Sequence, residues 1–267
     1  MSDDDFGAIE PYVTSIDLPL GTILYEDGDT VQHVYFPVDC IVSIVAVLED
    51  GTSPEMVTIG REGMAGLVPF LGNREVFGRY IVQLPGKALR ITSERLSELM
   101  ASKPSLRQSL FCYLQALAAQ TFQSVACNAV HPIEARCCRW ILMTHDRVRH
   151  DHLALTHEFL AAMLGVHRPT VSIVARTLQN AGLIEQQRRV IRIKDRKGLE
   201  EAACECYRQI RGRFERLLPI LQGLTDNAIA GGPLPRIVRG GLGPAHHAAH
   251  THEATINATR ASPKPVA

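Results

Sequence analysis

The sequence lacks any long apolar run. No segment of its 267 residues keeps about eighteen consecutive apolar side chains, so a membrane-spanning helix is not expected. The N-terminus, MSDDDFGAIE, is acidic and lacks the basic and apolar regions of a secretion signal. A disulfide framework is also not expected, because the cysteines are odd in number and scattered: Cys40, Cys112, Cys127, Cys137, Cys138, Cys204 and Cys206. We therefore expect a cytoplasmic protein.

Histidine is scarce where a β-barrel enzyme would need it. Between residues 14 and 100 there is only His33, whereas a metal enzyme of cupin type needs two or three histidines and a carboxylate converging in the barrel. We therefore expect no enzymatic activity, no catalytic residues, no cofactor and no metal site. A metal-binding alternative exists in the C-terminal tail, but we attribute its histidines to composition: His246, His247, His250 and His252.

Charge is unevenly distributed, although the formal net charge is zero. Residues 1–100 hold six Lys and Arg against sixteen Asp and Glu, a net charge of −10. Residues 136–197 hold twelve Lys and Arg against five Asp and Glu, a net charge of +7. This separation predicts an acidic domain beside a domain that binds a polyanion.

The stretch from Thr156 to Leu183 has the pattern of a helix-turn-helix. Leu160 and Leu164 share one face of a first helix, and Gly165 follows where a helix end favours positive φ. Pro169 falls in the first turn of the second helix, where its missing N–H is least costly. Further buried positions are expected at Ala161, Val166, Val171, Val174 and Leu178. The outward side chains expected to meet DNA are Arg168, Thr170, Ser172 and Arg176; an ordinary αα-hairpin is the alternative.

A short hairpin is predicted directly after this unit. Leu183-Ile184 and the run Val190 to Ile193 are β-type segments on either side of a polar tip. This is the pattern of a winged helix-turn-helix, and we expect Arg188 and Arg189 at the tip to contact a backbone phosphate. The alternative is a merely solvated turn.

Short β-type runs separated by turn signals occupy the chain from about Thr14 to Ile91. They predict an antiparallel β-roll with a hollow interior, followed by a short helix that Thr92 caps. From Ser105 to Ala129 comes the longest helical run, which is apolar and carries only Arg107 as a charge. Such a helix is buried, and we favour a dimer seam over the central helix of a monomer. The expected seam residues are Leu106, Leu110, Leu114, Leu117, Thr121 and Val125.

His131-Pro132 marks a hinge, and Trp140 is interpreted as a core anchor of the next domain. One further helix is expected over the stretch that begins at Leu199. The whole is an α+β chain in five parts: a loose lead-in (1–13), an antiparallel β-roll sensor domain (14–103), a long dimerisation helix (104–130), a winged helix-turn-helix DNA-binding domain (131–222) and a disordered tail (223–267).

A β-roll, a long helix and a winged helix-turn-helix, in this order, resemble the Crp/Fnr family of bacterial transcription regulators. The resemblance covers about residues 14–215, is strongest over 155–184, and is moderate at Leu18-Pro19-Leu20-Gly21 and Val34-Tyr35-Phe36. It implies a homodimer that binds a palindromic operator in double-stranded DNA, with recognition helices about 34 Å apart. It also implies RNA polymerase as a partner and a cyclic-nucleotide-binding-like domain for the roll.

The resemblance also implies roles for individual residues. Arg168 matches the position where many members carry a base-reading arginine, and arginine to guanine is the commonest specific contact. Pro169 and Ile173 stand where the cyclic-AMP receptor protein has a glutamate and a second arginine, so the operator is expected to differ. Thr156, His157 and Thr170 would contact phosphate or sugar.

The stretch GREGMAGLVPFLGNREVFGRYIVQL departs from the family's cyclic-nucleotide pattern. Leu67 falls where the family has a glutamate for the ribose hydroxyl, and Phe77-Gly78 fall where an Arg-Ser pair holds the phosphate. Leucine accepts no hydrogen bond and phenylalanine carries no charge, so we expect an effector other than cyclic AMP. Arg74 and Arg79 lie in the same stretch and could bind an anionic ligand. A cyclic-nucleotide-responsive regulator remains the alternative.

The cysteines do not match the family's oxygen-sensing branch, because that branch has an N-terminal cluster and none precedes Cys40 here. Cys204 and Cys206 are two apart on an expected helix, where they would point to different faces and chelate poorly. The adjacent Cys137 and Cys138 are assigned to packing, while a redox role for Cys112 or Cys127 stays open. A ligand-binding roll without DNA contact is a further alternative, which the positive segment 136–197 disfavours.

Overall fold

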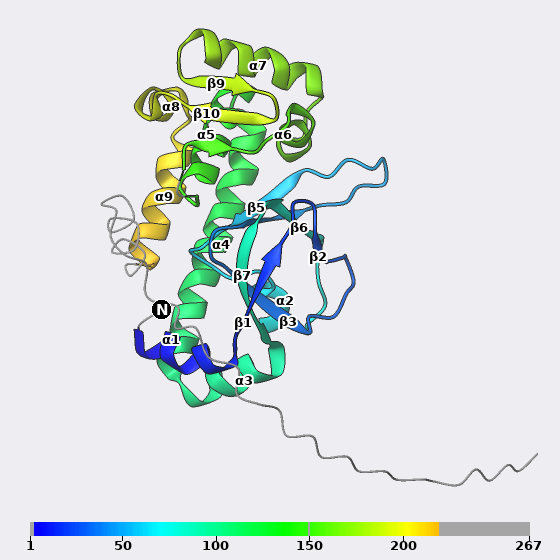
Figure 1. The fold of residues 1–267 in the computed structure, drawn as a ribbon, viewed down its shortest axis with the longest axis vertical. Helices are drawn as coiled ribbons and strands as arrows, with labels where there is room; N and C mark the ends of the chain where they lie inside the picture. Colours follow the sequence, from blue (N-terminus) through cyan, green and yellow to red (C-terminus); the bar gives the residue numbers. More distant parts are fainter. Residues whose placement is uncertain (1–2, 149, 219–267) are drawn as a thin grey trace, which may run out of the picture. The chain divides into compact units, whose positions relative to one another are not determined.

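The computed structural model describes residues 3–148 and 150–218. They form a β-roll, a long helix and a second small domain, as Figure 1 shows. The predicted C-terminal tail lies outside the described residues. In chain order the elements are α1 (Asp3–Ile9), the 3-10 helix η1 (Glu10–Tyr12), β1 (Thr14–Leu18), β2 (Ile23–Tyr25), β3 (His33–Pro37), β4 (Ile41–Val45), β5 (Glu55–Ile59), α2 (Leu67–Leu71), β6 (Arg79–Leu84), β7 (Gly86–Thr92), α3 (Ser93–Ser102), α4 (Pro104–Val130), α5 (Ile133–His145), β8 (His152–Leu153), α6 (His157–Leu164), α7 (Arg168–Asn180), β9 (Ile184–Gln187), β10 (Val190–Ile193), α8 (Arg196–Ala202) and α9 (Cys206–Leu217).

The β-roll consists of two antiparallel sheets, with strand orders β2-β6-β4-β5 and β1-β7-β3. Strand β4 is buried at every residue because it serves two cores. Ile41 and Val45 pack in the core of the DNA-binding half, and Val42 and Ile44 pack inside the roll. This alternation follows from the two-residue period of a strand. It makes β4 the strand that both halves of the chain share.

Tyrosine rings pack inside the roll and connect its two sheets. Tyr25 of β2 contacts Tyr80 of β6 edge-on at 5.0 Å and Tyr35 of β3 at 5.8 Å between ring centroids. Edge-to-face contacts of this kind are favourable for aromatic rings. A hollow interior was predicted, and in this part of the roll the rings fill it.

The first residues are more ordered than the predicted loose lead-in. Residues Asp3–Ile9 form α1, and Ile9 is buried in the core of the roll. Asp5 accepts a hydrogen bond of 2.6 Å from the Ser105 hydroxyl at the start of α4. The expectation for 1–13 was wrong because one buried aliphatic side chain and one polar contact fix this segment.

Helix α4 confirms the predicted long helix, and one face of it covers the roll (Figure 1). Leu106, Leu110 and Leu117 are buried there together with Tyr113. The turn that ends at Gly63 lies so close that a Cβ at this glycine would come within 1.9 Å of the Tyr113 ring. No described helix is long and apolar enough to cross a membrane.

The chain after α4 bends at the predicted hinge, because α4 ends at Val130 and α5 begins at Ile133. The expected single C-terminal helix is instead two helices, α8 and α9. Ala203 adopts an extended conformation with φ −75 and ψ 152, which ends α8 and lets the chain turn before Cys206. No glycine or proline marks this break, so the sequence pattern gave no sign of it.

Candidate nucleic-acid interface

Helices α6 and α7 form the predicted helix-turn-helix. The Thr156 hydroxyl caps α6 by accepting a 3.1 Å hydrogen bond from the backbone N–H of Phe159. Gly165 ends α6 at φ 64, the left-handed conformation that glycine adopts without strain. All the residues predicted to fill the space between the helices are buried or partly buried: Leu160, Ala161, Leu164, Val166, Val171, Val174 and Leu178.

The outer face of α7 is open to solvent. Arg168, Pro169 and Arg176 are exposed, and Thr170 is half-buried in the first turn. Ile173 lies between them with 66% of its surface exposed, which is unusual for an isoleucine. A helix that buries its aliphatic face and presents arginines and one apolar side chain has the form of a major-groove recognition element.

Arg168 forms an ion pair with Glu158. Its Nε lies 2.7 Å from Oε1 of Glu158 in the first turn of α6, and both side chains are more than half exposed. An exposed pair of this kind contributes only about 0–1 kcal/mol to stability. It leaves the terminal nitrogens of the guanidinium available, and it sets the direction in which they point. Glu158 was not predicted as a site residue, because the pair crosses the turn and follows no helical spacing.

His157 joins three elements of the domain. Its Nδ1 lies 3.0 Å from the Ser172 hydroxyl of α7, and its Nε2 lies 2.9 Å from Oε1 of Gln186 in β9. In the structure, His157 and Ser172 therefore contact each other, whereas the sequence analysis expected each of them to contact DNA. Both ring nitrogens have protein partners, so the histidine positions the wing against α7.

The predicted wing is a three-stranded sheet in the order β8-β10-β9, and β8 was not predicted. Val190 pairs with Gln187, so the tip consists of only Arg188 and Arg189. Arg189 has φ 58, a left-handed conformation that costs a residue with a side chain of order 1 kcal/mol. Both arginines are exposed at the tip.

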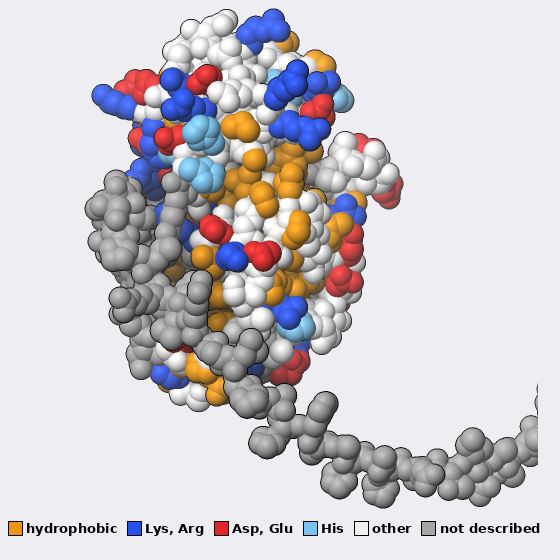
Figure 2. Space-filling view, viewed as in Figure 1, with side chains coloured by type: hydrophobic (Ala, Val, Ile, Leu, Met, Phe, Trp, Pro, Cys, Tyr) orange, Lys and Arg blue, Asp and Glu red, His pale blue; other side chains and the backbone are white. Residues whose placement is uncertain are grey.

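The structure brings most of the predicted DNA-contacting residues to one open groove between the helix-turn-helix and the wing. Its lining consists of Leu155, Thr156, His157, Glu158, Arg168, Gln186, Gln187, Arg188, Arg189, Val190 and Ile191. Figure 2 shows Lys and Arg side chains gathered at the end of the molecule that carries α7 and the wing. Acidic side chains lie along the visible edge of the roll instead, as the charge separation predicted.

The predicted seam of α4 needs a correction. Leu106, Leu110 and Leu117 are buried against the roll of their own chain, so they cannot form a surface for a partner. Leu114 and Thr121 are half-buried, and Val125 alone among the six predicted residues is exposed, to 66%. The outward apolar stripe of α4 instead follows a three/four spacing through Phe111, Leu114, Ala118, Phe122, Val125 and Ala129.

The five residues predicted for an effector pocket have different surroundings. Leu67 is buried in the roll, while Phe77 is 72% exposed and the Gly78 N–H donates to Asp27. Arg74 and Arg79 form ion pairs with Glu94 and Glu26, each at 2.7 Å. Both arginines therefore already have acidic partners.

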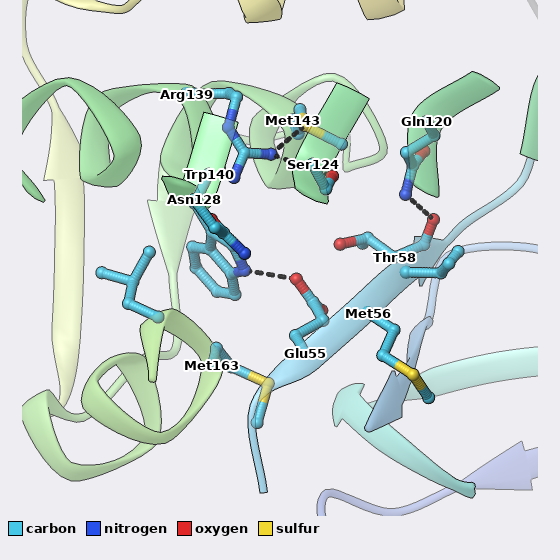
Figure 3. Close-up of a pocket in the computed structure, with 12 residues that line it drawn as sticks. Glu55, Met56, Thr58, Gln120, Ser124, Asn128, Arg139, Trp140, Met143 and Met163 are labelled. Atoms are coloured by element: carbon cyan, nitrogen blue, oxygen red, sulfur yellow. Dashed lines mark hydrogen bonds between the residues drawn. The ribbon is translucent and has the colours of Figure 1, made fainter. Parts of the chain in front are cut away.

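The roll and the DNA-binding half meet across a narrow cavity between β5, α4 and α5, which Figure 3 shows. Trp140, predicted as a core anchor, is 3% exposed and its indole N–H donates to the Glu55 carboxylate of the roll. Gln120 of α4 donates to the carbonyl oxygen of Thr58 at 3.1 Å. Trp140 thus connects the two halves as well as filling a core.

The interpretation of Cys204 and Cys206 as members of one helix was wrong. Cys204 lies in the turn between α8 and α9, and Cys206 is the first residue of α9. Both approach Cys127 and His131 at the C-terminal end of α4. The two-residue spacing predicted opposite faces only because an unbroken helix was assumed.

Two family models match the chain. A Crp-like helix-turn-helix domain matches residues 135–202, and a cyclic nucleotide-binding domain matches residues 16–103. No curated protein sequence gives a significant match.

Similar solved structures share the fold at low identity. The c-di-GMP-responsive global regulator CLP of Xanthomonas campestris aligns with a TM-score of 0.58 and 16% identity, over 72% of this chain and 99% of that one. FixK2 of Bradyrhizobium japonicum aligns with a TM-score of 0.58 and 16% identity, over 72% and 98%. A CRP-family transcriptional regulator of Thermus thermophilus aligns with a TM-score of 0.55 and 17% identity, over 70% and 96%. With both of its halves matched in the predicted order, the chain belongs to the Crp/Fnr family of DNA-binding transcription regulators.

Proposed function

We propose that the chain acts as a homodimer on a palindromic operator, with α7 of each copy in the major groove and the wing on the phosphate backbone. The observation that carries this proposal is the groove between the helix-turn-helix and the wing, which Arg168, Arg188 and Arg189 line together. Phosphate contacts supply affinity, and contacts to base edges supply specificity. RNA polymerase is the expected protein partner once the operator is bound.

Within α7, Arg168 contacts a guanine through its terminal nitrogens while Glu158 holds its Nε. Ile173 has no polar atom on its side chain, so at its exposed position it favours the methyl group of a thymine. Thr156, Thr170 and Arg176 lie nearer the backbone of the duplex. The resulting operator differs from one read by a glutamate and a second arginine.

The stripe on α4 that starts at Phe111 and ends at Ala129 forms the dimer seam. Phe122 and Val125 are 73% and 66% exposed in the single chain, which leaves large apolar surface in water. A copy related by a two-fold axis places the same stripe against this one and buries both. The dimer then fixes the distance between the two recognition helices.

The effector is proposed to be something other than cyclic AMP. Leu67 offers no acceptor for a ribose hydroxyl, and the nearby cations Arg74 and Arg79 are engaged by acidic side chains. Calorimetric titration with cyclic AMP and with cyclic di-GMP tests this point. Saturable binding of either nucleotide to the roll would favour the cyclic-nucleotide alternative.

The test of the DNA proposal is selection of bound duplexes from a random pool. A two-fold symmetric consensus is expected, and Arg168→Ala should cost about 1–3 kcal/mol on it and flatten preference at one base per half-site. Arg107→Ala, an exposed arginine on α4, is the matched control and should change nothing. An unchanged consensus for the Arg168 variant would show that α7 does not recognise the bases.

A further inference from the structure

Four side chains of types that can ligate a metal meet at the end of α4. One ligand atom from each of Cys127, His131, Cys204 and Cys206 lies within 4.8 Å of all the others. The Sγ atoms of Cys127 and Cys204 are 3.4 Å apart, and Sγ of Cys206 lies 3.5 Å from Nδ1 of His131. All three cysteines are buried, and the histidine side chain is 19% exposed.

Two sequence-distant pairs build this cluster. Cys127 and His131 are four residues apart at the end of α4, a spacing that puts them on one face. Cys204 and Cys206 flank Glu205 in the turn that starts α9, where the chain is not yet helical at Cys204. Each pair supplies two ligands, and the packing of α9 beside α4 brings the pairs together.

We propose that Cys127, His131, Cys204 and Cys206 bind one thiophilic divalent cation, Zn²⁺ above others, in a tetrahedral site. Zinc–sulfur bonds of about 2.3 Å place the sulfur atoms of such a site roughly 3.8 Å apart, so the observed separations need only small adjustments. Three thiolates and one imidazole suit zinc, whereas magnesium and calcium prefer oxygen. An iron–sulfur cluster distributes its ligands over several irons, and these ligand atoms are too close together for that.

The surroundings of the cluster are those of a metal site. Nε2 of His131 lies 3.2 Å from the Glu205 carboxylate, which leaves Nδ1 to face the thiols. A carboxylate on the outer nitrogen is the usual partner of a metal-bound histidine. The Gln123 amide donates to Sγ of Cys206 at 3.1 Å, as an N–H group does to a metal thiolate.

The net charge expected for the zinc-loaded cluster also suits the buried side chains around it. Three thiolates, a neutral imidazole and a divalent cation leave one negative charge. Arg139 is 5% exposed, and its Nε is among the buried atoms without a hydrogen-bond partner in the described part of the chain. The buried guanidinium therefore gains a counter-charge when the site is loaded.

Zinc is bound by thiolates, so loading the site would release the protons of the three thiols.

Four protein ligands make the site structural, because no position remains for a substrate. Its consequence is mechanical, since the metal ties α9 to the end of α4, next to the hinge at His131-Pro132. The orientation of the DNA-binding domain on the long helix then depends on metal supply.

The experiment is a Co²⁺ titration of the full chain, purified without metal-affinity chromatography and kept reduced. Co²⁺ reports geometry, since a tetrahedral thiolate site gives intense visible bands and a sulfur-to-cobalt charge-transfer band. One Co²⁺ per chain with both features is expected, and added Zn²⁺ should remove them. The histidines of the tail cannot mimic this result because they provide no thiolate.

Cys127→Ser and Cys204→Ser should each abolish the charge-transfer signal of the full site, whereas Cys112→Ser should keep it. Cys112 is the matched control, because it lies on the same helix and outside the cluster. If a variant misfolds, the melting temperature of the wild-type chain still tests the proposal. Zn²⁺ should raise this temperature, and a chelator should reverse the rise. A reduced wild-type chain that gives only octahedral Co²⁺ spectra, or whose spectrum and melting temperature do not change with either metal, would overturn the proposal.

Discussion

Nε of Arg147 lies 2.6 Å from Oε1 of Glu62, and this ion pair joins the two halves of the chain where both side chains are almost completely buried. Arg147 follows α5, while Glu62 belongs to the roll. The other guanidinium nitrogens of Arg147 donate to the Met143 carbonyl and to Gln120 of α4. One side chain therefore connects the roll, the long helix and the DNA-binding half.

Arg147→Met should destabilise the protein by about 3–5 kcal/mol, because it leaves the buried Glu62 carboxylate without a cation. Urea denaturation followed by circular dichroism measures the loss. Lys87→Ala, which breaks the exposed pair with Asp17, should cost less than about 1 kcal/mol. Adding Glu62→Gln to the Arg147 variant should restore part of the stability. If the double variant instead loses the sum of the two single-variant losses, the two side chains are not energetically coupled.

Phe122→Glu should convert the proposed dimer to a monomer and weaken operator binding, because a charge at the centre of the stripe cannot be buried against its copy. Sedimentation equilibrium gives the mass in solution. Phe77→Glu is the matched control, since Phe77 of the roll is 72% exposed and Phe122 is 73% exposed. A Phe122 variant that remains dimeric would place the seam elsewhere.

Arg189→Gly should move stability and DNA affinity in opposite directions. Glycine relieves the left-handed φ at the wing tip and should stabilise the fold by about 1 kcal/mol. Loss of the guanidinium should weaken binding to all duplexes alike and lower the salt dependence by about one phosphate contact. Thermal melting and fluorescence anisotropy at several salt concentrations measure the two effects, with Arg188→Ala as the variant that changes affinity alone.

Glu158→Gln should strengthen binding to non-specific DNA and reduce discrimination between operators. The substitution removes a negative charge from the groove that faces the phosphates, and it weakens the ion pair that directs Arg168. Affinity for the selected operator and for a scrambled duplex, measured at one salt concentration, gives the ratio. If this ratio is unchanged, Glu158 does not position Arg168.

Sequence periodicity predicted the elements that have one buried face. Val171, Val174 and Leu178 repeat at helical spacing, and they are the buried residues that define the inner side of α7. The same argument failed for α4, since Leu110 and Phe122 are both apolar and only tertiary packing decides which one faces the roll. A helix whose apolar residues lie on all sides carries no clear periodic signal for its outward face.

Sequence spacing also could not predict contacts between segments that are joined by turns. Arg168 with Glu158, and Cys127 with Cys204, join segments whose separation follows no helical or strand period. The cysteine cluster was missed for a specific reason, because Ala203 breaks a helix that contains no glycine or proline there. A CxC pair beside a CxxxH pair is the signal that would have indicated it.

Glu55 makes the stability of the contact between the two halves depend on pH. It lies beside Trp140 and Ser43, and burial raises its pKa above the ordinary value of 4.5. The Ser43 hydroxyl has one proton and lies near two acceptors, Glu55 and Gln83. When Ser43 donates to Gln83, a protonated Glu55 can donate to Ser43, which suits the raised pKa.

The direction of the effect follows from linkage. Below the unfolded pKa, Glu55 is protonated in both states and costs nothing; as pH rises toward the folded pKa, the unfolded state ionises first and the native state loses stability. Glu55→Gln mimics the protonated acid, so it should match the wild type near about pH 4 and exceed it near about pH 8. Urea denaturation across this range measures the difference, and Glu49→Gln on the exposed surface of the roll should show none. A constant gap between wild type and Glu55→Gln at every pH would mean that the pKa of Glu55 is the same in the folded and unfolded states.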